Sequence, residues 1–317
     1  MRISAYLIAI FFSVLFLQSC QKELDSNIPP APPKPDTLGV GWSSVSITGE
    51  EGLSDIFFRS QNIGYVAGKK IYKSIDSGRT WAPIFNEPRI FNIFMVNDSR
   101  GLFVDFQLWK TKDGGSSFEA PGIFNVGDVY VDGKFGYLTT SGGLYQTIDS
   151  GENWRRVFTI GLNLQGGYSS LVCVSYQWAR VVSANGIYKI LANETSWGTV
   201  PVTGGSGPPY CSISLPPQSD TMFVANYKGQ IYRSIDIGDS FSFIRQLGPT
   251  GFTDIHFVSG LIGYASVDRF IYKTIDAGNT WTKIVALGEG VIHEIHFIDE
   301  NHGWACADNG KVLIYKP

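Results

Sequence analysis

Short apolar segments alternate with turn-forming residues along this chain, and their order repeats about every 40 residues. The first segment is four residues long, in the order polar, aliphatic, variable and apolar, as in Asp55–Phe58. The second often begins with glycine and an aromatic residue, and the third joins Ile or Leu to an aromatic and usually a basic residue, as in Ile71–Lys73. Apolar positions with a period of two, bounded by Gly, Asn and Asp, predict short β-strands.

A motif of the form Ser/Thr-x-Asp-x-Gly-x-Thr-Trp follows the third segment, so it is predicted to be a hairpin turn before a fourth strand. Its five clear copies lie at Ser74–Trp81, Thr111–Phe118, Thr147–Trp154, Ser234–Phe241 and Thr274–Trp281. Their aspartates are Asp76, Asp113, Asp149, Asp236 and Asp276, and three copies end in tryptophan, at Trp81, Trp154 and Trp281. The gap between Asp149 and Asp236 is about twice the others, and a degenerate copy at Ile187–Trp197 fills it.

Two roles are open to the motif aspartates. Asp and Ser/Thr side chains in turns hydrogen-bond nearby backbone, and glycine permits a positive φ. Calcium binding is the alternative, but one carboxylate per turn is few for calcium. We therefore expect a structural role.

Seven copies of the first and third segments are present, but the seventh repeat stops at Pro317 before any fourth strand. Gly41–Ile47 at the other end resembles that strand, with Trp42 in the position of the motif tryptophan. We therefore predict an all-β fold: a seven-bladed β-propeller of four-stranded antiparallel blades over residues 40–317. The N-terminal strand is expected to join the last blade and close the ring.

The N-terminus is not expected to belong to the propeller. Ala5–Leu17 is almost wholly apolar but short for a membrane span, and it leads into Leu-Gln-Ser-Cys, which resembles a bacterial lipobox. That resemblance implies a signal peptide over residues 1–19 and lipidation of Cys20, with a proline-rich tether over residues 20–39. We therefore expect a lipid-anchored protein of the bacterial cell envelope, at the outer membrane or the cell surface. The alternative is an ordinary secretory signal with an incidental cysteine.

Composition narrows the function only slightly. The net charge is −3 and 17% of residues are charged, so no basic excess favours nucleic acid. Three cysteines follow Cys20, an odd number that leaves at least one thiol unpaired, and their spacing matches no metal site. No cofactor or metal is expected.

The motif and the blade pattern together resemble Asp-box (BNR-repeat) β-propellers, and within them most resemble the photosystem II stability/assembly factor-like proteins. The resemblance implies a scaffold that holds a protein partner, and it does not imply a photosynthetic host. Sialidases share the Asp box, but their arginine triad has no counterpart at one level of separate blades here. Arg59, Arg89 and Arg269 are the nearest candidates. No catalytic residues are therefore assigned.

The first residue of each inner strand forms a polar series, and we expect it near the mouth of the central channel. Its members are Asp55, Asn92, Asp128, Ser170, Ser212, Asp254 and Glu294. Four carboxylates there would attract a cation or a basic peptide. Alternatively, each polar group bonds backbone of the adjacent blade.

Two further groups complete the candidate site. His256 and His296 occupy equivalent inner-strand positions, and ordinary packing is expected rather than a metal site. The loops with Tyr227 and Arg269 carry the mixed aromatic and charged character that suits protein or glycan recognition.

The sequence thus favours a monomeric, membrane-anchored and non-enzymatic binding or assembly platform with a protein partner. A carbohydrate-active, sialidase-like or glycan-binding propeller is the alternative, and a purely structural envelope module is a third.

Overall fold

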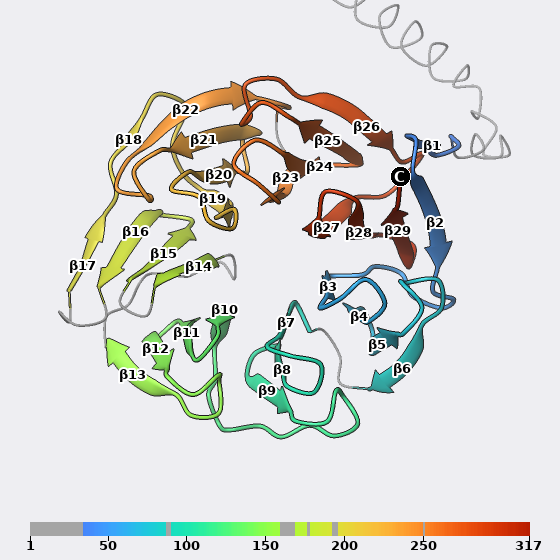
Figure 1. Cartoon of the computed structure of the whole chain (residues 1–317), viewed down its shortest axis with the longest axis horizontal. Helices are drawn as coiled ribbons and strands as arrows, with labels where there is room; N and C mark the ends of the chain where they lie inside the picture. Colours follow the sequence, from blue (N-terminus) through green and yellow to red (C-terminus); the bar gives the residue numbers. More distant parts are fainter. Residues whose placement is uncertain (1–33, 87–89, 159–168, 176–177, 192–195, 250) are drawn as a thin grey trace, which may run out of the picture. The chain divides into compact units, whose positions relative to one another are not determined.

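The computed structural model describes residues 34–86, 90–158, 169–175, 178–191, 196–249 and 251–317. In residues 35–317 seven sheets are arranged in a ring around a central axis (Figure 1). Their strands pair antiparallel, except for one short parallel pair at the rim of the fifth sheet. The predicted all-β, seven-bladed propeller is confirmed. The signal peptide, Cys20, most of the tether, Arg89 and the turn of the degenerate motif copy lie outside the described residues.

Each blade runs from an inner strand at the channel to an outer strand at the rim. Blade 1 contains β3 (Asp55–Phe58), β4 (Gly64–Ala67), β5 (Ile71–Ser74) and β6 (Ala82–Phe85). Blade 2 contains β7 (Asn92–Met95), β8 (Gly101–Val104) and β9 (Leu108–Thr111). Blade 3 contains β10 (Val126–Asp132), β11 (Phe135–Thr140), β12 (Gly143–Thr147) and β13 (Arg155–Phe158). Blade 4 contains β14 (Ser169–Ser175), β15 (Trp178–Ser183), β16 (Gly186–Leu191) and β17 (Ser196–Thr199).

The remaining blades follow the same order, and two of them carry a fifth, short strand at the rim. Blade 5 contains β19 (Tyr210–Ser214), β20 (Met222–Asn226), β21 (Gln230–Ser234) and β22 (Phe241–Gln246), with β18 (Val202–Thr203) outside it. Blade 6 contains β23 (Phe252–Phe257), β24 (Gly263–Val267), β25 (Phe270–Thr274) and β26 (Thr282–Ala286), with β1 (Thr37–Leu38) outside it. Blade 7 contains β27 (Ile292–Asp299), β28 (His302–Ala307), β29 (Lys311–Tyr315) and β2 (Trp42–Ser46).

Blade 2 departs from the predicted four strands. After its Asp box only isolated bridges form, between Lys110 and Glu119 and between Gln107 and Phe124. Pro121 has no N–H to donate, and Gly122 adopts a positive φ of 77°. These two residues interrupt the segment that would be the outer strand.

The predicted closure of the ring is confirmed by β2, which pairs antiparallel with β29 from Trp42 opposite Tyr315 to Ser46 opposite Lys311. The chain meets the propeller earlier than expected, because Thr37 and Leu38 pair with β26. Asp36 also accepts a hydrogen bond from the Gly288 N–H at 2.9 Å and pairs with Lys311 at 2.5 Å.

The core lies between blades, where an aromatic residue near the end of an inner strand stacks on the preceding blade. Phe257 stacks on Phe223 with ring centroids 3.5 Å apart, and Phe297 stacks on Tyr264 at 3.6 Å. Glycine begins the second strand because a Cβ on Gly263 would lie 2.5 Å from the Phe257 ring. The recurring Gly-aromatic pair therefore serves this stacking.

In the part of the chain that the structure describes, no helix has the length and apolar character needed to cross a membrane.

Candidate functional site at the channel mouth

A cavity of about 590 Å³ opens where the inner strands begin, on what we call the mouth face. Its wall includes polar residues from six blades: Asn92, Asp128, Ser170, Ser212, Asp254 and Glu294. Tyr227 and His293 also line it, and none of the described residues in its wall is Lys or Arg. Asp55 is buried and is not part of this wall.

Local irregularity of the strands helps to place these polar side chains. The pairing register shifts in the residues directly before Ser212, Asp254 and Glu294, and between Val126 and Val129 around Asp128. A β-bulge bends a strand and re-aims its side chains. The bulges therefore lie where the strands meet the mouth.

The polar series also joins neighbouring blades. Asp55 accepts hydrogen bonds from the backbone N–H of Ile56 at 2.6 Å and of Ile93 in the next blade. Asp254 accepts one from the Ile295 N–H of the next blade at 3.3 Å. Such bonds compensate for taking carboxylates out of water. Asp55 and Asp254 therefore bond backbone of the adjacent blade, which was one of the two roles considered for the polar series.

Side chains of the series also bond one another. The Asn92 amide donates to Asp128 Oδ1 at 2.8 Å, and the Ser212 hydroxyl donates to Asp254 Oδ1 at 2.7 Å. Glu294 lies in the same buried cluster, where Asp254 acts on its carboxyl group.

Burial changes the proton affinity of this cluster. It raises the pKa of Asp55 to about 7 and that of Asp128 to about 8. Burial, and then the nearby Asp254, raise the pKa of Glu294 well above its ordinary value. Near neutral pH these buried carboxyl groups therefore bind protons more readily than exposed carboxylates do.

A collar of aromatic and histidine rings lies one step further along the inner strands. Phe57 contacts Phe94 with ring centroids 5.4 Å apart and His296 at 4.6 Å, Phe94 contacts Tyr130 at 5.3 Å, and His256 contacts His296 at 5.5 Å. Residues two apart on a strand share a face, so the collar follows the polar series along the channel.

The two histidines of the collar are held as neutral donors. His256 donates from Nε2 to the Phe297 carbonyl and His296 to the Phe58 carbonyl, each at 2.9 Å. Burial lowers the pKa of both and brings that of His296 to about 3. Among the described residues, no group of three His, Cys, Asp or Glu side chains has an arrangement that could hold a metal ion.

Only one of the two loop residues predicted for this face lines the cavity. Tyr227 lines it, whereas Arg269 contacts its own blade, where it donates to the Gly288 carbonyl at 3.2 Å and lies 5.2 Å from the Phe270 ring centroid. His293 was not predicted at the mouth, and its side chain pairs with Asp308 at 2.7 Å.

An apolar groove adjoins the mouth over blades 1 and 2. It has a volume of about 510 Å³, includes Ile90, Phe91 and Phe106, and shares Gly52, Ser54 and Phe91 with the mouth cavity. Phe106 is 78% exposed and Phe91 37%, and the nearby Phe124 is 61% exposed. We call Phe91, Phe106 and Phe124 the phenylalanine patch. Sequence reasoning missed it, although an apolar residue at the tip of the Asp105–Gln107 turn was a signal.

The Asp boxes lie at the opposite end of the strands, on the Asp-box face. Asp76 accepts hydrogen bonds from the Thr80 N–H at 2.9 Å, the Thr80 hydroxyl at 2.7 Å and the Ser74 hydroxyl at 2.8 Å. Ser77 and Gly78 have φ of 66° and 84°, so the turn uses two left-handed residues in succession. Corresponding bonds surround Asp113, Asp149, Asp236 and Asp276.

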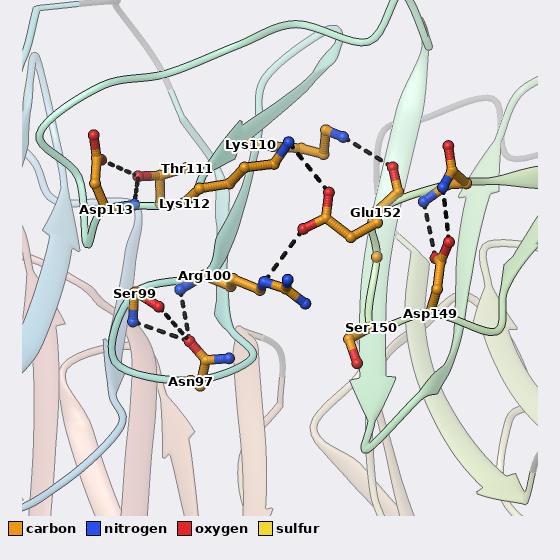
Figure 2. A network of polar contacts seen from close by, with 12 residues as sticks. Asn97, Ser99, Arg100, Lys110, Thr111, Lys112, Asp113, Asp149, Ser150 and Glu152 are labelled. Carbon is orange, nitrogen blue, oxygen red and sulfur yellow. Dashed lines mark hydrogen bonds and ion pairs between the residues drawn. The ribbon is translucent and has the colours of Figure 1, made fainter.

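The boxes are also fastened to neighbouring elements. Trp81 packs edge-on against Phe58, Trp281 packs likewise against Phe257, and Trp154 joins the core cluster between blades 2 and 3. Figure 2 shows the boxes of blades 2 and 3, where Arg100 and Lys112 both pair with Glu152 at 3.2 Å. These contacts join the Asp boxes to neighbouring strands and blades.

The arginines weighed for an enzyme site do not converge among the described residues. Arg59 lines a separate cavity beside Asp113 on the Asp-box face, whereas Arg269 lies on the mouth face. Cys173, Cys211 and Cys306 are all unpaired.

Comparison with known proteins shows the fold. No protein-family model matches the sequence, and no curated protein matches it either. Among solved structures, YCF48 from Cyanidioschyzon merolae has a TM-score of 0.69 at 17% identity, over 87% of this chain and 99% of that one. A structure of YCF48 bound to a D1 peptide has a TM-score of 0.68 at 17% identity, over 87% of this chain and 97% of that one.

The same fold is found in an enzyme. The GH74 xyloglucanase from Xanthomonas campestris has a TM-score of 0.63 at 13% identity, over 85% of this chain and 52% of that one. A fold shared at such identity leaves the function to be argued from the site.

Proposed function

We propose that this protein is a non-enzymatic binding or assembly platform of the bacterial cell envelope, anchored through lipid on Cys20, and that its mouth face binds a protein partner. The observation that carries the proposal is the continuity of the carboxylate-lined mouth with the phenylalanine patch. Exposed aromatic side chains beside polar groups are typical of protein interfaces.

The two faces of the ring differ in what they leave for a partner. On the Asp-box face the motif carboxylates are occupied by donors of their own turns. On the mouth face three phenylalanine side chains are exposed beside a cavity. The structure of YCF48 with a D1 peptide supports the idea that a propeller of this shape can hold a peptide.

The carbohydrate-active alternative is less well supported. Retaining glycosidases hold two carboxyl groups about 5 Å apart, and inverting enzymes hold them further apart. Asp254 instead accepts hydrogen bonds from Ser212 and Ile295, and Asp128 accepts them from Asn92 and Val129. These carboxyl groups therefore bond side chains and backbone of the ring.

The proposed anchor is tested by labelling the native host with a clickable fatty acid. We expect the full chain to carry label and to fractionate with membranes, and Cys20→Ala to lose both. Labelling that persists in Cys20→Ala would rule out the anchor and leave the platform proposal standing.

The proposed platform is tested by affinity capture from envelope extract of the native host. The double variant Phe91→Ser/Phe106→Ser removes patch side chains, and Ile75→Ser/Ile235→Ser is its control on the Asp-box face, where both isoleucines are exposed. We expect one protein to be retained by the wild type and the control and lost by the patch variant. Equal retention by all three would overturn the proposal.

A further inference from the structure

Two adjoining parts of the mouth face differ in chemistry. The cavity contains Asp128, Asp254 and Glu294 and no described Lys or Arg in its wall. The groove beside it is lined mainly by apolar and glycine residues, and its one described cation, Lys69, pairs with Glu51 at 2.7 Å. Phe91 belongs to both, so a short segment can reach both at once.

We propose, resting on the function proposed above, that the mouth face recognises a linear peptide segment in which Lys or Arg lies next to or near an aromatic or large aliphatic residue. The basic side chain enters the channel mouth, and the apolar side chain enters the groove against Phe91 and Phe106.

Charge complementarity selects the basic side chain. A carboxylate oxygen has two lone pairs, so Asp254 can accept a further bond beyond those from Ser212 and Ile295. An acidic segment would instead meet three carboxyl groups in the cavity, and the described linings of the cavity and the groove contain no unpaired Lys or Arg.

The groove selects the apolar side chain. Phe106, at the tip of a turn, leaves most of its surface in water, and Gly52 and Gly68 line the space beside it. Covering Phe106 and Phe91 removes apolar surface from water, which favours binding. The pair Lys69 and Glu51 leaves little net charge at this rim.

The test is a selection from a displayed library of random heptapeptides on the full mature chain. We expect the enriched peptides to combine Lys or Arg with Phe, Trp, Tyr or Leu. A labelled synthetic peptide of the enriched sequence is then compared with the same peptide carrying norleucine in place of its base. We expect at least about tenfold weaker binding for the norleucine peptide.

Variants of the protein locate the peptide. Phe106→Ser should weaken binding at least about tenfold, and so should Asp254→Asn, whereas Ile235→Ser on the Asp-box face should leave it unchanged. Phe106 and Ile235 are both exposed, so neither change perturbs the core. The norleucine peptide tests the charge without altering the protein, should Asp254→Asn fail to fold.

Enrichment of acidic or uncharged peptides, or of none, would overturn this inference, and so would binding that Phe106→Ser does not weaken. Capture of a partner by the wild type but not by Phe91→Ser/Phe106→Ser would still uphold the proposed function in that case. Failure of the proposed function shows separately, as capture that the patch variant retains.

Discussion

Phe58 stacks face to face on Trp304, with ring centroids 3.6 Å apart and planes 2° from parallel. The two residues lie far apart in sequence but join the first blade to the last. The Trp304 indole also donates to the Ser77 carbonyl of the first Asp box at 2.9 Å. The last blade is thus held to the first by side chains as well as by β2.

Trp304→Ala should lower the free energy of unfolding by about 3 to 5 kcal/mol, because it leaves a cavity at a fully buried interface. Trp304→Phe should lower it less, since the ring remains and only the indole hydrogen bond and some volume are lost. Urea unfolding of both variants checks this, with Phe106→Ala as an exposed-site control. A cost for Trp304→Ala no larger than that of the control would show that the blade contact is not stabilising.

Asp76→Ala should destabilise the protein by about 1 to 3 kcal/mol, because the Thr80 N–H and two hydroxyl groups lose their acceptor. Asp76→Asn keeps one acceptor oxygen and should cost less. Thermal unfolding with and without calcium checks both points. A rise in the melting temperature of the wild type with calcium that Asp76→Ala abolishes would contradict the structural role.

The buried carboxyl groups predict that stability falls as pH rises. Asp55 and Asp128 have raised pKa values, about 7 and about 8, whereas unfolded aspartates titrate near about pH 4. Between these limits the folded state binds more protons than the unfolded state. Each group therefore contributes a loss of up to about 1.4 kcal/mol per pH unit, until pH exceeds its folded pKa.

Asp55→Asn and Asp128→Asn should each flatten that slope. Urea unfolding at about pH 5, 6, 7 and 8 measures it. Stability that stays constant or rises over this range in the wild type would contradict protonation of the ring.

The fold was predictable because the repeat carries it. Each copy places its strands in the same order, so Trp42 could be recognised as the start of the strand completing the last blade. The exception is blade 2, where Pro121 and Gly122 interrupt the outer strand after a clear Asp box. Local backbone chemistry there overrides the repeat.

The site was predictable only in part. The polar series stood out because its members share one repeat position, and so did His256 and His296. The third residue of the inner strand is aromatic or His in five of seven copies, which was an available signal for the collar. The phenylalanine patch depends on how the turn at Phe106 meets Phe91 and Phe124 in space, and a pattern along one chain does not contain that proximity.

Site-specific photo-cross-linking in intact host cells tests the central claim most directly. A benzoylphenylalanine replaces either Phe106 on the mouth face or Ile235 on the Asp-box face, both highly exposed. The account predicts a discrete protein adduct from the Phe106 position and none from the Ile235 position. Adducts from the Ile235 position alone, or from neither, would contradict it.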